Sequence, residues 1–270
     1  MEKKVAIITG ASSGIGEALA YQFGKEGFRL LITGTNEKRI NAVSNNLNKY
    51  NIDHKTLIHD VSIENDNKKM VDFAIKSFGR IDVLICNAGI SIRSLFENVD
   101  IKIFKKLFNI NFFGAIYGTK FSLPYLEKTK GTIIAMSSLN GFIATPTRSA
   151  YVASKHAMQG FYDSLRLELL NKEINVMVIS PGYVKSNFRL NTLKSDGKKE
   201  GVSSRDSKKM MDPEFLAKKI FIGYSKKKRN MIFTFRGKLA HLIKNWFPRL
   251  SDKLAYKEIL NEKESLLKSN

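Results

Sequence analysis

A tyrosine and a lysine four residues apart are the side chains whose spacing in this sequence most directly suggests chemistry. Tyr151 and Lys155, in Tyr-Val-Ala-Ser-Lys, fall on one face of the chain if the segment is helical. A free tyrosine has a pKa near ~10, and an adjacent ammonium favours the phenolate and lowers that pKa. Such a phenol can give its proton to an alkoxide that develops on a carbonyl. Tyr and Lys at this spacing are common on amphipathic helices, so the pair alone identifies no enzyme.

The elements that must position this pair alternate between strand-like and helix-like segments. Repeated units of this size predict an α/β fold of Rossmann type, a doubly wound parallel sheet of about seven strands with helices on both faces. Its ligands would lie beyond the carboxyl ends of the strands, so the residues after the first, fourth, fifth and sixth strands should meet in one crevice. The expected strands are Val5–Thr9, Leu30–Thr33, Thr56–His59, Ile81–Cys86, Thr132–Met136, Ile174–Ile179 and Met231–Phe235.

A glycine-rich turn joins the first expected strand to the first expected helix. It reads Thr9-Gly-Ala-Ser-Ser-Gly-Ile-Gly16, so its spacing is G-x-x-x-G-x-G and not G-x-G-x-x-G. Glycines let the backbone turn tightly and approach a pyrophosphate, which the free N–H groups of the following helix can bind. The turn alone could also be a plain strand-to-helix connection.

Several motifs in the same order resemble the short-chain dehydrogenase/reductase family. Thr9–Gly16 looks like the opening motif of that family, Asp60-Val61 like its adenine-contacting pair, and Asn87-Ala88-Gly89 like its N-A-G turn. The resemblance runs from about Lys4 to Gly182 and also takes in Pro181-Gly182, which resembles the turn beside the nicotinamide. Ser186 stands where a threonine is commoner in the family, but it keeps a hydroxyl for the carboxamide.

The resemblance implies a catalytic group of Asn111, Ser138, Tyr151 and Lys155. Ser138 lies thirteen residues before Tyr151, an interval seen in many members, and this favours it over Ser137. Its hydroxyl would stabilise charge on the substrate oxygen. Lys155 would also bond to the nicotinamide ribose. Asn111, within a long helix expected from Ile101 to Leu126, would hold a water that links the lysine to solvent; alternatively, it is a polar residue satisfied by its own helix.

The end of the second strand should determine the choice of dinucleotide. An acid there binds the ribose hydroxyls of NAD, whereas a 2′-phosphate requires its absence and usually a nearby Arg. The segment Thr33-Gly-Thr-Asn36 has no acid, and it also lacks the Arg that many NADP-type relatives carry near Thr35. Hydroxyls and the Arg39 side chain could hold the phosphate, so we expect NADP rather than NAD. The expected cofactor contacts are Gly10, Ser12, Ser13, Gly14, Ile15, Gly16, Thr35, Arg39, Asp60, Val61, Asn87, Ala88, Gly89, Tyr151, Lys155, Pro181, Gly182 and Ser186.

Composition limits the remaining options. The 270 residues fit a single oxidoreductase domain, with 187–211 as a substrate lid and 236–270 as a basic helical tail. No long apolar run or signal peptide is evident, and the one cysteine, Cys86, excludes an intrachain disulfide, so a cytoplasmic protein is expected. The few scattered histidines show no zinc-ligand spacing, and no metal is expected. We also expect a homo-oligomer, as in many members of the family.

The formal net charge of +20 is concentrated near the C-terminus. Residues 215–251 hold ten Lys or Arg and no Asp or Glu, interleaved with apolar side chains. A stripe of Leu239, Leu242, Ile243, Trp246 and Phe247 could lie in a membrane interface, or it could pack on the last strand and form the substrate pocket. A nucleic-acid partner lacks any accompanying recognition motif.

The sequence thus predicts an enzyme that transfers a hydride between NADP(H) and a ketone or secondary alcohol. The apolar tail favours a hydrophobic substrate such as a lipid, steroid-like or acyl carbonyl, because relatives that act on steroid or lipid ketones have similar tails. Two rival hypotheses remain on the same fold: a catalytically silent protein that senses dinucleotides, and a protein that binds a membrane surface through its tail.

Overall fold

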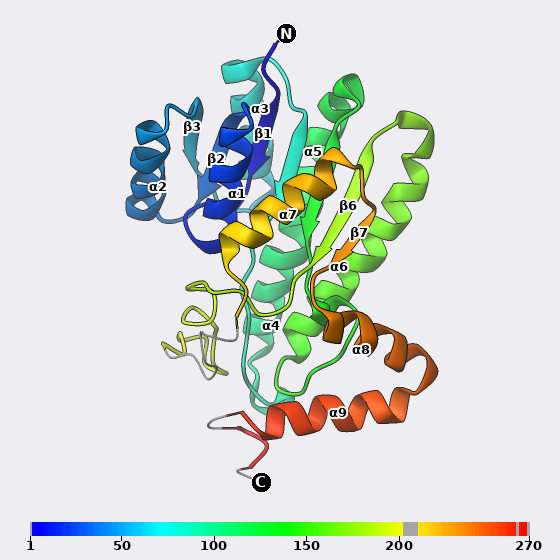
Figure 1. Ribbon diagram of the computed structural model, residues 1–270. Coiled ribbons are helices and arrows are strands. Elements are labelled where there is room, and N and C mark those ends of the chain that lie inside the picture. The colour runs from blue at the N-terminus through cyan, green and yellow to red at the C-terminus, as the bar shows by residue number, and fades with distance from the viewer. Residues whose placement is uncertain (1, 202–209, 263–264, 269–270) are drawn as a thin grey trace.

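The computed structural model describes residues 2–201, 210–262 and 265–268, and it contains one parallel sheet of seven strands in the order β3-β2-β1-β4-β5-β6-β7 (Figure 1). The chain order reverses between β1 and β4, which is where such sheets bind their ligands. The predicted doubly wound parallel sheet is therefore confirmed. The strands are β1 (Val5–Ile8), β2 (Arg29–Gly34), β3 (His54–Ile58), β4 (Val83–Cys86), β5 (Thr132–Met136), β6 (Asn175–Ser180) and β7 (Asn230–Ile232).

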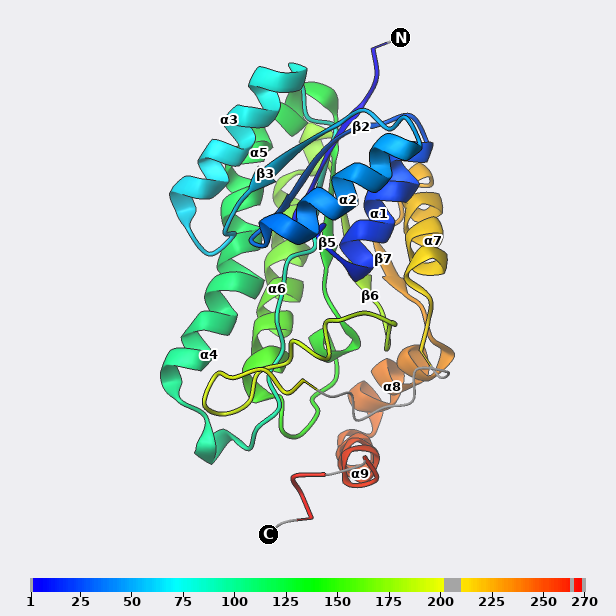
Figure 2. The same cartoon turned by 90° about the vertical axis from the view of Figure 1, so that its left-hand side faces the viewer.

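Helices cover both faces of the sheet (Figure 2). Alternate residues of β1 point to opposite faces: Ala6 and Ile8 pack with α1, α2 and α7, and Val5 and Ile7 pack with α3, α5 and α6. This two-sided burial explains why the strands are continuous apolar runs. The helices are α1 (Gly14–Lys25), α2 (Glu37–Lys49), α3 (Glu64–Phe78), α4 (Ile101–Phe108), α5 (Gly114–Thr129), α6 (Ser149–Glu168), α7 (Pro213–Ser225), α8 (Phe235–Trp246) and α9 (Pro248–Leu260).

Two elements differ from the sequence-based expectation. The long helix predicted over Ile101–Leu126 is divided into α4 and α5 by a π-helical turn, Asn109–Phe113, which contains Asn111. The last strand ends at Ile232 and not at Phe235, because Thr234 begins a helix there: its Oγ1 accepts a hydrogen bond from the Gly237 N–H at 3.0 Å.

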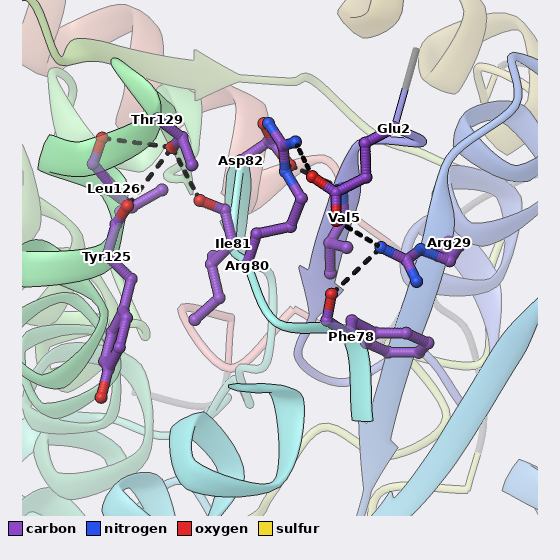
Figure 3. Close-up of polar contacts among 10 residues, drawn as sticks. All are labelled: Glu2, Val5, Arg29, Phe78, Arg80, Ile81, Asp82, Tyr125, Leu126 and Thr129. Atoms are coloured by element: carbon purple, nitrogen blue, oxygen red, sulfur yellow. Dashed lines mark hydrogen bonds and ion pairs between the residues drawn. The ribbon is translucent and has the colours of Figure 1, made fainter. Parts of the chain in front are cut away.

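The edge of the sheet where the strands begin, which we call the amino edge, is held by paired charges (Figure 3). The Asp82 carboxylate, just before β4, accepts from the Val5 N–H at 2.8 Å and from Arg80 at 2.7 and 2.9 Å. Arg80 also pairs with Glu2 at 2.7 Å. Thr129 donates to the Ile81 carbonyl at 2.8 Å. These contacts fix β1, β4 and the loop before β5 relative to one another.

The segment expected to be a lid pairs with the loop after β4. Ile92 and Leu193 form an isolated parallel bridge, and Leu193 bridges Lys199 in the antiparallel sense. A buried ion pair joins Arg93 to Glu200 at 2.5 Å. Residues 202–209 of the expected lid lie outside the described residues, as do residues 263–264 and 269–270 of the expected tail.

The C-terminal region forms α8 and α9, which extend from the body of the protein below the carboxyl edge of the sheet (Figures 1 and 2). Lys244 of α8 donates to the Phe142 carbonyl and lies 3.3 Å from His156 Nε2, so α8 is attached to α6. Within the described residues, no helix combines the length and apolar character needed to cross a membrane.

Candidate active site

The carboxyl edge of the sheet borders a cleft of about 1640 Å³. Its lining comes from the segments after β1 to β6 and from α8 and α9, so the predicted convergence on one crevice is observed. Among the predicted site residues, Asn111 alone does not line the cleft, because its side chain is completely buried. The lining includes Gly10, Ser12, Ser13, Gly14, Ile15, Gly16, Thr35, Arg39, Asp60, Val61, Asn87, Ala88, Gly89, Ser138, Tyr151, Lys155, Pro181, Gly182 and Ser186.

The glycine turn after β1 has little room for side chains. Gly10 has φ +64°, and a Cβ there would lie 2.8 Å from the Ala88 Cα. A Cβ on Gly16 would collide with the Gly10 carbonyl oxygen. The Asn87 amide donates to the carbonyls of Thr9 and Gly10, each at 3.0 Å. The N-A-G turn after β4 therefore buttresses the glycine turn, which gives both motifs a structural reason.

This turn leads directly into the N-terminus of α1, which begins at Gly14. The first residues of α1 line the cleft, and the N–H groups of a helix's first turn have no acceptor within the helix. The Ser13 side chain does not accept a hydrogen bond from them. A helix N-terminus that follows a turn with glycines at its close-approach positions is suited to a pyrophosphate. The residues present thus fit the dinucleotide that the fold implies.

Thr35 and Arg39, which follow β2, are exposed and line the cleft. Asn36 is the N-cap of α2 and accepts from the Arg39 N–H at 2.9 Å, so its amide oxygen is already used. Asp60, after β3, accepts from the N–H and hydroxyl of Ser62 at 2.9 and 2.7 Å. The acid in this part of the cleft is therefore Asp60, which the sequence assigned to the adenine side.

Tyr151 lies in the first turn of α6 and is 9 % exposed. Burial raises the pKa of its phenol, and a hydrogen bond with Ser138 and the positive charge of Arg148 partly offset this effect. In the protein without cofactor, burial outweighs these lowering effects. The sequence-based prediction that Lys155 lowers this pKa concerns the protein with an oxidised nicotinamide beside it, and it stays a prediction.

Lys155 follows one turn later and is 3 % exposed. Its Nζ donates to the Met136 carbonyl at the end of β5 at 2.8 Å and lies 5.8 Å from the centre of the Tyr151 ring. Burial lowers the pKa of Lys155 from 10.5 to about 8. The ammonium is thus held at the base of the cleft on the same face as Tyr151, as the i, i+4 spacing predicted.

The two serines after β5 have different surroundings. Ser138 lines the cleft, caps a short 3₁₀ turn by accepting from the Asn140 N–H at 3.1 Å, and lies close enough to Tyr151 to lower the pKa of its phenol. Ser137 is 5 % exposed, its hydroxyl has no partner among the described residues, and it lies against Gly141. This geometry supports the preference for Ser138.

Asn111 hydrogen-bonds outside its own helix. Its amide donates to the Ile90 carbonyl and to the Ser154 hydroxyl, both at 3.0 Å, and its oxygen accepts from the Ile90 N–H at 2.8 Å. The alternative that Asn111 is satisfied by its own helix is therefore wrong. A Cβ on Gly89 would lie 3.2 Å from the Asn111 oxygen and 3.8 Å from Lys155 Nζ, so Asn111 fixes the loop against which the lysine packs.

The turn after β6 approaches the glycine turn from the other side. The Pro181 carbonyl accepts from the Leu139 N–H at 3.3 Å, and a Cβ on Gly14 would lie 2.8 Å from the Ser186 Cβ. Sequence reasoning missed two residues beside Tyr151. The Phe188 ring lies 6.1 Å from the Tyr151 ring, and Arg148 is a buried cation in the cleft. Neither belongs to a recognisable motif, although Arg148 is only three positions from Tyr151.

The fold and this cleft define a nicotinamide-dependent oxidoreductase of the short-chain type, and comparisons with known proteins agree. Residues 4–196 match the family model described as short chain dehydrogenase. A Drosophila melanogaster "Dehydrogenase/reductase SDR family protein 7-like" is 35% identical over 253 residues, which cover 92% of this chain and 78% of that protein. An Arabidopsis thaliana "11-beta-hydroxysteroid dehydrogenase 1A" is 40% identical over 185 residues, which cover 68% of this chain and 53% of that protein.

Solved structures share the fold. A short-chain dehydrogenase/reductase from Burkholderia phymatum in complex with NAD superposes with a TM-score of 0.83 at 20% identity, covering 93% of this chain and 96% of that one. An alcohol dehydrogenase from Thermococcus sibiricus complexed with 5-hydroxy-NADP gives 0.75 at 23% identity, covering 86% and 96%. The chain belongs to the short-chain dehydrogenase/reductase family and is an NAD(P)-dependent oxidoreductase.

Proposed function

We propose that the protein uses NADPH to reduce a hydrophobic ketone to a secondary alcohol, and that Tyr151 is the proton donor. The observation that carries this proposal is the arrangement of Tyr151, Ser138 and Lys155 in a cleft that the glycine turn also lines. A silent dinucleotide sensor would not require this group of side chains.

The side chains of this group have different roles in the proposed reaction. The Ser138 hydroxyl donates a hydrogen bond to the substrate oxygen and stabilises the charge that develops there. Tyr151 donates its phenolic proton to the same oxygen. The positive charges of Arg148 and of Lys155, whose Nζ lies 5.8 Å from the ring, stabilise the phenolate that this leaves. When bound, the reduced nicotinamide supplies the hydride. Lys155 also holds the cofactor's ribose, and the Met136 carbonyl fixes its ammonium. Asn111 positions the loop beside it.

A preference for NADP(H) is part of this proposal. Arg39 is exposed at the end of the cleft where β2 terminates, near the hydroxyls of Ser12 and Thr35, and no carboxylate follows the strand before Glu37. Arg39→Gln should weaken the binding of NADPH and leave the binding of NADH nearly unchanged, because the lost charge would contact only the 2′-phosphate. Fluorescence titration measures the affinity for both cofactors. An equal loss of affinity for both would show that Arg39 does not bind the 2′-phosphate.

The proposed reaction is tested with purified protein, NADPH and a panel of neutral ketones, with absorbance of the reduced cofactor as the readout. Tyr151→Phe keeps the ring but removes the proton, so it should lower kcat by about 10² to 10⁴. Unchanged NADPH affinity in the variant would show that the cleft is intact. A variant that retained the wild-type rate would exclude Tyr151 as the acid.

We further propose that the enzyme works at an anionic lipid surface, which would also supply an apolar substrate. The predicted apolar stripe is divided: Leu239 and Ile243 line the cleft, whereas Leu242, Trp246 and Phe247 are 56%, 77% and 63% exposed. The same region carries the ten cations without an acid. Exposed aromatic side chains among basic ones are suited to the interface of an anionic bilayer.

Sedimentation with vesicles tests the membrane proposal. The protein should pellet with phosphatidylserine-containing vesicles and not with pure phosphatidylcholine, and the double variant Trp246→Ser/Phe247→Ser should stay in solution. Ile63→Ser removes an apolar side chain of similar exposure, 49%, from the start of α3 and should pellet like the wild type. Equal pelleting of the wild type and the double variant would exclude this surface.

A homo-oligomer forms the last part of the proposal. Phe113 beside α5 and Leu167 and Leu170 at the end of α6 are 40%, 61% and 68% exposed. A second copy could cover these side chains. Light scattering gives the mass directly, and Leu167→Lys/Leu170→Lys should lower it to that of one chain.

A further inference from the structure

Arg148 is a buried cation of the cleft whose side chain has no partner among the described residues. Arg148 is 9 % exposed and lines the cleft beside Tyr151. Across residues 2–201, 210–262 and 265–268, its guanidinium forms neither a hydrogen bond nor an ion pair. The other buried arginines differ from it, because Arg93 pairs with Glu200 and Arg166 pairs with Asp163.

The backbone that carries Arg148 is strained. Thr147 has φ +65°, a left-handed conformation that is costly for a β-branched residue. Its carbonyl accepts from the Ser94 N–H at 2.9 Å, so the loop after β4 holds it in place. Arg148 is the next residue and precedes α6 at its N-cap position. The fold thus maintains an unfavourable conformation immediately before an unpaired buried charge, a combination that is typical of functional sites.

The rest of the cleft does not supply a counter-ion. Its described lining contains six Lys or Arg and two Asp or Glu. The two carboxylates are Asp60, which is bonded to Ser62, and Glu258 of α9, and neither pairs with Arg148. Apolar side chains also line the cleft beside Tyr151: the Phe188 ring lies 6.1 Å from the Tyr151 ring, and Leu193 belongs to the same apolar cluster as Tyr151. A ligand that matches this surface has an apolar body and one negatively charged group.

We propose that Arg148 is the binding site for an anionic group, a carboxylate or a phosphate, on the substrate of this enzyme. The planar guanidinium can bind either anion through two parallel hydrogen bonds. This inference rests on the proposed function, because it places the anion on the same molecule as the apolar ketone. It also narrows that function: the preferred substrates are acidic apolar ketones and not neutral ones.

The alternative to an anion site is that Arg148 acts on Tyr151 alone, since its charge lowers the pKa of that phenol. The two roles predict different results. An electrostatic effect on Tyr151 alters the reduction of every ketone by the same factor. An anion site alters the binding of charged ligands in particular.

Calorimetric titration of the protein saturated with NADP⁺ separates these roles without turnover. The probes are octanoate, octyl phosphate and uncharged octanamide, which carry apolar chains of similar length and no alcohol that NADP⁺ could oxidise. Wild-type protein should bind at least one anion about tenfold or more tightly than octanamide, as a charged hydrogen-bonded contact implies. Arg148→Gln should abolish that preference and Arg148→Lys should retain part of it. The better of the two anions identifies the group.

Lys106→Gln is the matched control, because Lys106 is an exposed cation of the same lining. It should keep the preference, whereas a loss as large as that of Arg148→Gln would reveal only a general positive field and overturn the site. Unchanged NADP⁺ affinity in Arg148→Gln would show that this variant is folded. A wild-type protein without preference for either anion overturns the inference, even if neutral ketones are reduced. Anion binding without any ketone reduction would instead overturn the proposed reaction and leave the site standing.

Discussion

The two edges of the parallel sheet differ in whether their buried charges have counter-ions. At the amino edge, Asp82 is 5 % exposed and bonds to Arg80 and to the Val5 N–H (Figure 3). At the carboxyl edge, Lys155 and Arg148 are 3 % and 9 % exposed, but no carboxylate pairs with either among the described residues. The pKa values reflect this contrast: the bond to Asp82 raises the pKa of Arg80, whereas burial lowers that of Lys155 to about 8.

The difference separates stability from function within one fold. A buried charge with a counter-ion fixes the backbone around it, whereas a buried charge without a counter-ion opposes folding. The amino edge therefore holds the strands together, and the carboxyl edge keeps cations without counter-ions ready for ligands. Substitutions at the two edges should affect different measurements, and the following changes test that division.

The largest effect on stability is expected at the amino edge. Asp82→Ala leaves the Val5 N–H without its acceptor and removes both bonds of Arg80 to Asp82, so it should lower the free energy of unfolding by about 3 kcal/mol. Urea denaturation measures this change, and kcat/KM below the transition should stay within twofold of the wild type. A loss below about 1 kcal/mol would mean that the amino edge does not depend on this pair.

At the carboxyl edge, Lys155→Met should increase stability near neutral pH while abolishing activity. Burial lowers the pKa of Lys155 from 10.5 to about 8, so between these values the unfolded chain holds a proton that the folded chain has lost. Stability of the wild type should therefore rise with pH across this window, by on the order of 3 kcal/mol at most. The methionine variant lacks this rise. Its gain in free energy of unfolding over the wild type should therefore be largest below pH 8 and vanish towards pH 10.5.

Urea melts of both proteins at several pH values measure the difference in slope. The slope is the decisive quantity, because the variant also loses the hydrogen bond to the Met136 carbonyl and its stability carries a constant offset. Parallel pH profiles for the two proteins would contradict the idea that the lysine is buried at a cost.

Much of this contrast was accessible from the sequence, but only for one edge. The buried strands, the glycine turn and the i, i+4 pair of Tyr151 and Lys155 follow from local patterns, since apolar runs, glycine spacing and helix periodicity are properties of neighbouring residues. The order of motifs then placed Ser138 correctly in the cleft. The site's position at the strand ends followed from the general rule for parallel sheets.

The remaining features depend on contacts between distant segments. The partners of Asp82 lie at Val5 and Arg80, and those of Asn111 in the loop at Ile90 and in α6. Whether the apolar stripe of α8 is buried or exposed depends on how the helix docks on Phe142, which no local pattern encodes. The sign of the shift in the pKa of Tyr151 also required the structure, because burial, which a spacing rule ignores, outweighs nearby charge.

A smaller effect is expected from Gly10→Ala at the carboxyl edge. The new Cβ would lie 2.8 Å from the Ala88 Cα in a left-handed conformation, so the free energy of unfolding should fall by about 2 kcal/mol. The same methyl group crowds the pyrophosphate position, and NADPH affinity should fall with it. Thermal melts with and without NADPH separate the two effects: cofactor should stabilise the variant less than the wild type.

The smallest effect, of opposite sign, is expected from Lys130→Gly at the amino edge. Lys130 ends α5 with φ +50°, a left-handed cap that glycine adopts without strain. Its ion pair with Glu173 is about two-thirds exposed on both sides and contributes little. After the greater entropy of glycine in the unfolded chain is subtracted, the free energy of unfolding of the variant should rise by about 0.5 kcal/mol.

The control is Lys120→Gly, at an exposed right-handed position inside the same helix, which should instead lower the free energy of unfolding by about 1 kcal/mol. Because neither residue lines the cleft, both variants should keep the wild-type kcat/KM; a change in activity here would show that the two edges are coupled.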